Sequence, residues 1–342
     1  MASSRSGSDS DFEFPFELDD TKPVKHRTSN PTCRSAGPDP NVDPDADIIM
    51  GGAQEGASAS EHVEGASPDG NMEDIGLHRA YVSASPDGST AKTLIYLPDM
   101  FGPDWRDHQL LADTYAKGGF HVVMPDILER DYMPKEFFDV IEPNAELRDQ
   151  MTVQEKTENR RKMFNNMGRM FYRHRVYISK PRVDSFIETL RKDPEIGKVG
   201  IVGTCWGGYH AILQARPGTG ISAIAALQPS FTKLQDWAAI SVPTYVTFGT
   251  GDTIVPASKS VEVSLRDPEP TDGLISPDLL ALSANEIAEA LDKRDDVEIK
   301  VRIFENQIHG FTYRGDWSTE DESKAMDECA QDVIAWFNEH LS

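Results

Sequence analysis

The chain has 342 residues and a formal net charge of −23 at pH 7, with 57 Asp and Glu against 34 Lys and Arg. A protein this acidic repels polyanions, so we expect no nucleic-acid partner. No run of about twenty apolar residues occurs and no hydrophobic leader follows Met1, so we expect no membrane partner. The three cysteines, at 33, 205 and 329, lack the spacing of a disulfide framework, which favours a reducing, cytoplasmic location.

Composition divides the chain into two parts. Residues 1–75 contain sixteen Asp and Glu against five Lys and Arg, a local net charge of −11, and are rich in Ser, Gly, Pro and Ala. This stretch has no apolar run able to form a core, so we expect it to be a disordered acidic tail. Residues 76–342 are expected to form a single folded domain.

Strand-like and helical segments alternate through the second part. Strands are expected at 77–83 and 93–97, paired with each other across the turn at 85–88, and then at 120–124, 198–202, 221–227, 243–248 and 297–304. Helices are expected at 106–117, 181–192, 283–291 and 325–341, with longer excursions at 128–177 and 262–295. This alternation predicts an α/β fold with a mostly parallel sheet and helices on both faces.

A basic cluster lies inside the first excursion. Residues 156–175 hold seven Lys and Arg and one acid, Glu158. One interpretation is a solvated helix face whose cations pair with acids elsewhere in the chain. The other is that Arg160, Arg161 or Arg173 reaches a pocket and holds a substrate carboxylate, because the guanidinium fork matches carboxylate geometry.

The sequence Gly203-Thr204-Cys205-Trp206-Gly207-Gly208 follows the strand expected at 198–202. This Gly-x-nucleophile-x-Gly pattern is typical of a nucleophile elbow, in which a sharp turn between strand and helix carries the nucleophile at its apex. Glycines are needed because a Cβ on either side of the apex would clash with the neighbouring strand or helix. Cys205 would stand at a helix N-terminus, where unpaired N–H groups favour a thiolate. The alternative is a cysteine packed as an ordinary core residue.

An acid and a histidine follow the elbow, each after a later strand. Asp252 follows the strand expected at 243–248, and His309 follows the strand expected at 297–304. Nucleophile, acid and histidine in this order are typical of α/β-hydrolases. His309 would take the thiol proton, and Asp252 would fix its tautomer. Asp126 also ends a strand, but it precedes the nucleophile and is the weaker candidate.

These motifs resemble those of the dienelactone hydrolase family, also called carboxymethylenebutenolidases, within the α/β-hydrolase superfamily. The resemblance spans residues 76–342 and rests on four stretches, Leu97-Pro98-Asp99-Met100-Phe101-Gly102, Gly203-x-Cys205-x-Gly207-Gly208, Gly251-Asp252-x-x-Val255-Pro256 and His309-Gly310-Phe311. It implies an α/β-hydrolase fold and a Cys-His-Asp hydrolase of small or cyclic carboxylic esters that needs no cofactor.

The resemblance also implies roles for residues around the triad. Asp99 stands where the family places an acid that contacts the resting thiol; that acid is commonly Glu, which is one methylene longer. The family pattern places an Arg anchor for the substrate close behind the histidine, which points to Arg314, with Tyr313 as the alternative at a shifted spacing. The elbow predicts that the N–H groups of Trp206 and Met100 form the oxyanion hole.

We therefore expect a cysteine-dependent hydrolase of small esters or enol-lactones, working through an acyl-enzyme and preferring substrates with a carboxylate. No metal site is expected, since the histidines outside the triad lack the spacing of metal ligands. A glutamine-amidotransferase-like enzyme also uses a Cys elbow, but Phe311 stands where that enzyme class carries Glu. The alternative from another class is a non-catalytic binding or scaffold protein that keeps a hydrolase shell and acts through its acidic tail.

Overall fold

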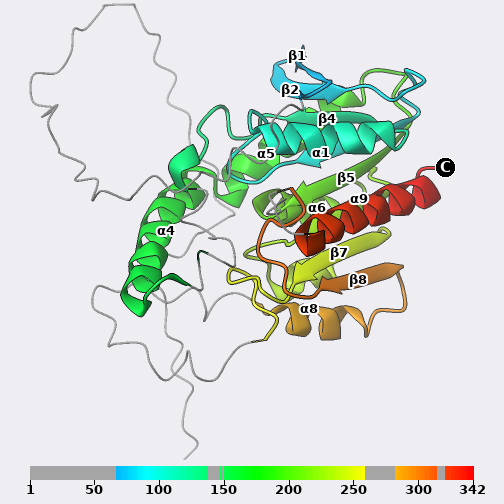
Figure 1. The fold of residues 1–342 in the computed structure, drawn as a ribbon. Helices are drawn as coiled ribbons and strands as arrows, with labels where there is room; N and C mark the ends of the chain where they lie inside the picture. The colour runs from blue at the N-terminus through cyan, green and yellow to red at the C-terminus, as the bar shows by residue number, and fades with distance from the viewer. Residues whose placement is uncertain (1–66, 138–146, 148–149, 259–281, 314–319) are drawn as a thin grey trace, which may run out of the picture. The chain divides into compact units, whose positions relative to one another are not determined.

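The computed structural model describes residues 67–137, 147, 150–258, 282–313 and 320–342 (Figure 1). The predicted tail up to residue 66 therefore lies outside the described residues, and so does most of the 262–295 excursion. The predicted boundary at residue 75 is wrong, because Asn71–Ile75 forms a strand, β1. That strand pairs along its whole length with the next one, and its side chains at 72 and 75 pack against the core.

In the part of the chain that the structure describes, eight strands form one sheet in the order β1-β2-β4-β3-β5-β6-β7-β8 (Figure 1). After β1, the strands are β2 (His78–Ser83), β3 (Lys92–Leu97), β4 (His121–Pro125), β5 (Lys198–Thr204), β6 (Ala223–Leu227), β7 (Thr244–Gly249) and β8 (Ile299–Phe304). Only the β1–β2 and β2–β4 pairs are antiparallel, and all pairs from β4 to β8 are parallel. The predicted mostly parallel sheet is confirmed.

The predicted pairing of β2 with β3 is wrong. β4 lies between them, antiparallel to β2 and parallel to β3. The turn that suggested a hairpin does form, since the Gly88 N–H donates to the Ser85 carbonyl at 3.0 Å, yet it connects strands that are not neighbours. The physical reason lies in burial: β3 is buried at five of its six positions, which is typical of a central parallel strand with a neighbour on each side.

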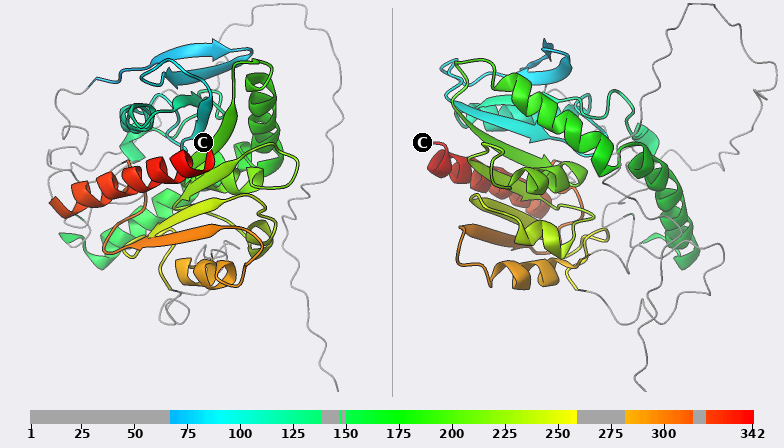
Figure 2. Two further views of the ribbon diagram at one scale, coloured as in Figure 1. Left: turned by 90° about the vertical axis from the view of Figure 1, so that its right-hand side faces the viewer. Right: turned by 180° about the vertical axis from the view of Figure 1, so that it is seen from behind.

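Helices cover both faces of the sheet, as predicted (Figures 1 and 2). α1 (Arg106–Lys117) and α9 (Glu320–His340) lie on one face, and α5 (Val176–Leu190) and α6 (Trp206–Gln214) lie on the other. The remaining helical segments are the short 3-10 turn η2 (Lys135–Phe137), α4 (Val153–Arg173), α7 (Leu234–Ala238) and α8 (Ala284–Leu291). None of the helices that the structure describes is long and apolar enough to cross a bilayer.

Two helices begin earlier than expected. α5 starts at Val176, so Pro181 lies inside the helix instead of opening it. Proline is favoured at the first helical position but is tolerated further in at the cost of one backbone hydrogen bond. α9 starts at residue 320, five residues before the predicted start, on a run of charged residues without apolar periodicity. α8 is confirmed, with the Ser283 hydroxyl accepting from the Glu286 N–H as its cap.

The register of the parallel strands brings their carboxyl ends to one edge of the sheet. Leu97 at the end of β3 pairs with Gly203 in β5, Leu227 at the end of β6 pairs with Thr204, and Gly249 at the end of β7 pairs with Phe304. The loops after β3, β5, β6, β7 and β8 therefore meet at this edge, which is where open α/β sheets place their ligands.

Candidate active site

Cys205 forms the apex of a sharp turn between β5 and α6. Its φ is +53° and its ψ is −112°, in a region that side chains with a Cβ rarely adopt, and it is 4 % exposed. The Cys205 N–H donates to the Leu227 carbonyl at 2.9 Å, and the Cys205 carbonyl accepts from the Tyr209 N–H at 3.1 Å. Neighbouring backbone thus holds the strained residue in place, as a nucleophile elbow requires.

The glycines of the elbow are required by close backbone contacts. A Cβ on Gly203 would lie 2.2 Å from the Gly207 carbonyl oxygen, and a Cβ on Gly207 would lie 1.9 Å from the Leu97 carbonyl oxygen. The second distance shows how closely the first turn of α6 packs against the end of β3. The Met100 segment therefore lies beside the elbow. Trp206 is the first residue of α6, where backbone N–H groups have no intrahelical acceptor.

His309 and Asp252 form the pair that the sequence predicts. His309 Nδ1 lies 2.8 Å from Asp252 Oδ2, while Asp252 Oδ1 accepts from the N–H groups of Ile254 and Val255 at 2.8 and 2.7 Å. Because the carboxylate accepts, Nδ1 carries the proton and Nε2 is left to act as the base. Nε2 is buried and has no hydrogen-bond partner within the described ranges.

The pKa of His309 depends on both Asp252 and Cys205. Burial lowers the pKa of His309, but the Asp252 carboxylate and the Cys205 sulfur raise it more, so the net pKa lies well above its ordinary value of 6.5. A histidine with a raised pKa binds a proton more tightly than a free imidazole does, which suits a group that has to accept one.

Asp126 has a different role. Its carboxylate accepts from the Arg130 N–H at 3.1 Å and lies 3.7 Å from the Arg79 guanidinium, so it closes the turn after β4. His309 hydrogen-bonds Asp252 instead.

Asp99 is bound by residues other than the nucleophile. Its Oδ1 accepts from the Phe101 N–H and from His108 Nε2, both at 2.9 Å, and its Oδ2 accepts from the Tyr313 hydroxyl. Burial raises the pKa of Asp99, but His108 and then Tyr313 lower it more, so the net pKa is below its ordinary value. The predicted contact between Asp99 and the resting thiol is not among the hydrogen bonds within the described ranges. The shorter side chain is engaged elsewhere.

Tyr313 and His108 extend this buried polar group. The predicted substrate role of Tyr313 competes with its bond to Asp99, and its ring stacks on His108 at a centroid distance of 4.1 Å. His108 Nδ1 lies 2.6 Å from the Tyr96 hydroxyl, which is 3.4 Å from the Thr204 hydroxyl next to Cys205. The chain of contacts joins the elbow to the histidine loop. Sequence reasoning missed His108 and Tyr96 because their partners lie on strands and loops that are far apart in the sequence.

Two residues of the loop after β6 also reach the site. Ser230 Oγ lies 3.5 Å from Cys205 Sγ, and Gln228 Oε1 accepts from the Gly310 N–H at 3.0 Å, beside His309. Both side chains are fully buried. Sequence reasoning missed them, although a signal existed: they directly follow a strand, at the same edge as the triad.

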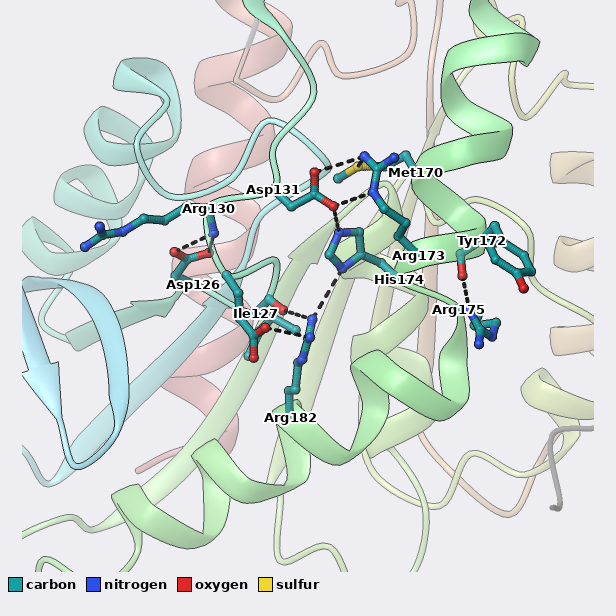
Figure 3. A network of polar contacts seen from close by, with 11 residues as sticks. Asp126, Ile127, Arg130, Asp131, Met170, Tyr172, Arg173, His174, Arg175 and Arg182 are labelled. Atoms are coloured by element: carbon teal, nitrogen blue, oxygen red, sulfur yellow. Dashed lines mark hydrogen bonds and ion pairs between the residues drawn. The ribbon is translucent and has the colours of Figure 1, made fainter. Parts of the chain in front are cut away.

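Two arginines of the basic cluster pair with acids, and Figure 3 shows the pair at Arg173. Arg173 makes two hydrogen bonds to Asp131, at 2.5 and 2.9 Å, and His174 makes a third at 2.9 Å. Arg161 pairs with Glu158 on the exposed face of α4. These pairs agree with the first interpretation, and a substrate role for Arg161 or Arg173 stays a prediction.

Arg182 on α5 adds to the polar contacts that these helices make with the loop after β4. Its guanidinium donates to the Ile127 carbonyl at 3.1 Å and to Glu129 at 2.7 Å (Figure 3). These contacts fix α5 to the loop after β4, while the bonds of Arg173 and His174 to Asp131 fix the end of α4 to the same loop. The side chain of Arg160 and all of Arg314 lie outside the described residues, so their predicted substrate roles stay predictions.

Over the ranges that the structure describes, no three His, Cys, Asp or Glu side chains gather as they would around a metal ion.

Comparisons with known proteins agree with this architecture. A model of the dienelactone hydrolase family matches residues 79–271. The chain is 24% identical over 272 residues to the hydrolase pyvD of Aspergillus violaceofuscus, covering 80% of this chain and 91% of that protein. It is 25% identical over 273 residues to the carboxymethylenebutenolidase homolog of Mus musculus, covering 77% of this chain and 88% of that protein.

Among solved structures, a putative dienelactone hydrolase from Klebsiella pneumoniae has a TM-score of 0.51 at 13% identity, covering 80% of this chain and 96% of that one. At this identity the likeness supports the fold alone. The match of the family model extends from β2 past the elbow and the acid. The chain thus belongs to the dienelactone hydrolase family, and it is a hydrolase that acts on esters.

Proposed function

We propose that this protein hydrolyses small carboxylic esters or enol-lactones through a Cys205-His309-Asp252 triad and a covalent acyl-enzyme. One observation carries the proposal: a buried His309 is hydrogen-bonded through Nδ1 to Asp252, and the Cys205 sulfur raises its pKa. An ordinary core cysteine would not stand at a strained turn beside a histidine whose pKa the cysteine sulfur raises.

The proposed reaction has two halves. His309 Nε2 takes the thiol proton, and the Cys205 sulfur attacks the ester carbonyl carbon to give a tetrahedral oxyanion. The N–H groups of Trp206 and Met100 stabilise that oxyanion. The C–O bond of the ester then breaks, and the leaving alcohol or enol takes the proton from His309.

In the second half, water is the nucleophile. His309 removes a proton from water as it attacks the thioester carbonyl, and the collapse of the second tetrahedral intermediate releases the carboxylic acid. The sulfur leaves as thiolate, and the imidazolium pairs with it again. Asp252 stabilises the imidazolium in both halves without accepting its proton. The reaction consumes only ester and water.

The substrate is proposed to carry a carboxylate near the scissile bond. The protein as a whole is strongly acidic, so long-range electrostatics disfavour anions and any preference must come from local contacts. Arg314 stands five residues after His309 and is the proposed anchor, because a guanidinium binds a carboxylate with two parallel hydrogen bonds.

The experiment compares two cysteine variants. Cys205→Ala should reduce kcat/KM for p-nitrophenyl acetate by about a thousandfold or more, because removal of a triad nucleophile has effects of that order. Cys329→Ala is the matched control: Cys329 is also buried, on α9, and should keep wild-type turnover.

Intact mass after rapid quenching should show one added acyl group in the wild type and none in Cys205→Ala. Turnover of Cys205→Ala within a few-fold of wild type would contradict the proposal. If neither protein turned over any ester, the scaffold alternative would be favoured instead.

A further inference from the structure

Ser230 lies against the sulfur of the nucleophile. Its Oγ is 3.5 Å from Cys205 Sγ, and its own N–H donates to the Cys205 carbonyl at 3.3 Å. The side chain is fully buried. We propose that Ser230 is a further catalytic residue, whose hydroxyl donates a hydrogen bond to the Cys205 thiolate. This inference rests on the proposed function of Cys205 as the nucleophile.

The hydroxyl proton of Ser230 has two acceptors within reach. Oγ lies 3.4 Å from the Gln228 carbonyl and 3.5 Å from the Cys205 sulfur. While the thiol keeps its proton, S–H donates to Oγ and the hydroxyl donates to the carbonyl. Once His309 takes the thiol proton, the hydroxyl rotates and donates to the negatively charged sulfur. Hydrogen bonds to a charged acceptor are the stronger ones, so the contact favours the thiolate.

The backbone around Ser230 is strained and held from several sides. Gln228 has a φ of +46° and Phe231 a φ of +62°, values that cost free energy in residues with a Cβ. The Gln228 N–H donates to the Thr247 carbonyl at 2.9 Å, and its side chain accepts from the Gly310 N–H. Strain maintained by such contacts clusters at functional sites, and here it places a hydroxyl beside the nucleophile.

Asp99 does not supply the hydrogen bond to the sulfur in this chain. Both of its oxygens accept from other donors, and as a carboxylate it has no proton to donate. Among the described residues, the titratable side chains that the surrounding elements bring to this end of the sheet are Tyr96, Asp99, His108, Tyr209, His210, Asp252, His309 and Tyr313. Of these, His309 is the group proposed to take the thiol proton. Substitution of Ser230 leaves His309 in place, so it measures the contribution of the Ser230 hydrogen bond separately from that proton transfer.

The test measures how fast iodoacetamide alkylates Cys205 as a function of pH, with peptide mapping to separate the three cysteines. Ser230→Ala should lower the rate about tenfold on the acidic side of the profile, shift its midpoint upward by about one pH unit, and leave the alkaline plateau unchanged. Ser230→Thr retains the hydroxyl and should restore the wild-type midpoint. Thr232→Val is the matched control, because that buried hydroxyl accepts from Trp237 Nε1–H instead of contacting the sulfur.

An unchanged midpoint in Ser230→Ala would overturn the inference. A purely structural role would lower the unfolding temperature without moving the midpoint, and it would also count against the inference. Should Ser230→Ala fail to fold, Ser230→Gly removes the same hydroxyl and the same criterion applies to it. Alkylation does not require ester turnover. A shifted midpoint with full turnover in Cys205→Ala would therefore refute the proposed function alone, and a fixed midpoint with Cys205-dependent turnover would refute the Ser230 role alone.

Discussion

Tyr313 donates its hydroxyl to Asp99 Oδ2 across 214 positions of sequence. Tyr313 lies on the loop that carries His309, and Asp99 precedes Met100, whose N–H is proposed for the oxyanion hole. One hydrogen bond thus fixes the loop of His309, the proposed general base, relative to the loop that is proposed to bind the developing negative charge. Both side chains are buried, so water does not compete for the contact.

Tyr313→Phe removes this bond and leaves a buried carboxylate with one donor fewer. The free energy of unfolding should fall by about 1.5–3 kcal/mol, the range for hydrogen bonds to charged groups. Urea denaturation measures it. The matched control is Tyr115→Phe, since the Tyr115 hydroxyl is buried without a partner among the described residues and its loss should cost nothing. Equal effects of the two substitutions would mean that the Asp99 contact contributes no stability.

Asp252→Asn should reduce kcat by up to about 10⁴-fold, because the amide no longer fixes the His309 tautomer or stabilises its charge. The pKa of His309 should fall in the variant, since the Asp252 carboxylate is the largest of the influences that raise it. Histidine resonances followed by NMR during a pH titration measure this change. Asp126→Asn, also at the end of a strand but bonded to the Arg130 N–H, should leave kcat and the His309 pKa unchanged.

The same substitution should change how stability depends on pH. The folded-state pKa of His309 is raised above its unfolded value of about 6.5, so its stabilising contribution is full below that pH and is lost as pH rises through the folded pKa. Asp252→Asn should remove most of this pH dependence. The measurement is the free energy of unfolding as a function of pH for both proteins. If it changed equally in both between pH 6.5 and the folded-state pKa, Asp252 would not be the group that raises the pKa of His309.

Gly207→Ala should unfold or inactivate the protein. The new Cβ would lie 1.9 Å from the Leu97 carbonyl oxygen, a distance that forces α6 away from β3 and moves Trp206 with it. Gly168→Ala in α4 is the control, because nothing lies within 4 Å of its Cβ and alanine is favoured in a helix by about 0.5–1 kcal/mol. Thermal unfolding and esterase turnover should separate the two variants, and a fully active Gly207→Ala would exclude this elbow geometry.

Two truncations should have different effects. Removal of residues 1–66 should leave the unfolding temperature unchanged, because that stretch offers little apolar surface to bury. Removal of residues 1–75 also deletes β1 and the Gly70 N–H that donates to the Tyr81 hydroxyl at 2.8 Å. A loss of about 2 kcal/mol would lower Tm by about 4–8 °C. Scanning calorimetry tests both, and a drop with the shorter truncation would show that residues 1–66 stabilise the fold.

Arg314→Ala should reduce kcat/KM about tenfold or more for an ester with a neighbouring carboxylate, since one charge-assisted pair contributes about 1.5–3 kcal/mol. It should spare a neutral ester such as p-nitrophenyl acetate. Steady-state kinetics on both substrates provide the comparison. Equal losses of kcat/KM for the two esters would mean that Arg314 supports the histidine loop and does not bind the substrate carboxylate.

The elbow and the His309–Asp252 pair were predictable because their local signals are strong. The Gly-x-Cys-x-Gly motif lies within five residues, although the contact that requires Gly207 comes from the distant Leu97, and Asp252 and His309 each directly follow a strand that apolar patterning identifies. The helices at 106–117 and 284–291 were predictable for the same reason, since their periodicity or cap is local.

Features decided by distant contacts were not predictable. A turn at residues 85–88 looks the same whether its strands pair directly or enclose β4. β1 carries mostly exposed side chains in an acidic stretch, and only its pairing with β2 makes it a strand. The partners of Asp99 come from α1 and from the histidine loop, and Ser230 meets the sulfur only because β6 lies beside β5.

Cys205 and His309 are carried by strands that lie far apart in the sequence, and this has a consequence for refolding. The elbow needs only β3, β5 and β6 in register, whereas His309 is delivered by β8, which ends the sheet order and pairs with β7. An intermediate without β8 would therefore present Cys205 on a formed elbow with no base to activate it. During refolding, ester turnover should therefore return only once β8 has docked, even where the elbow is already formed.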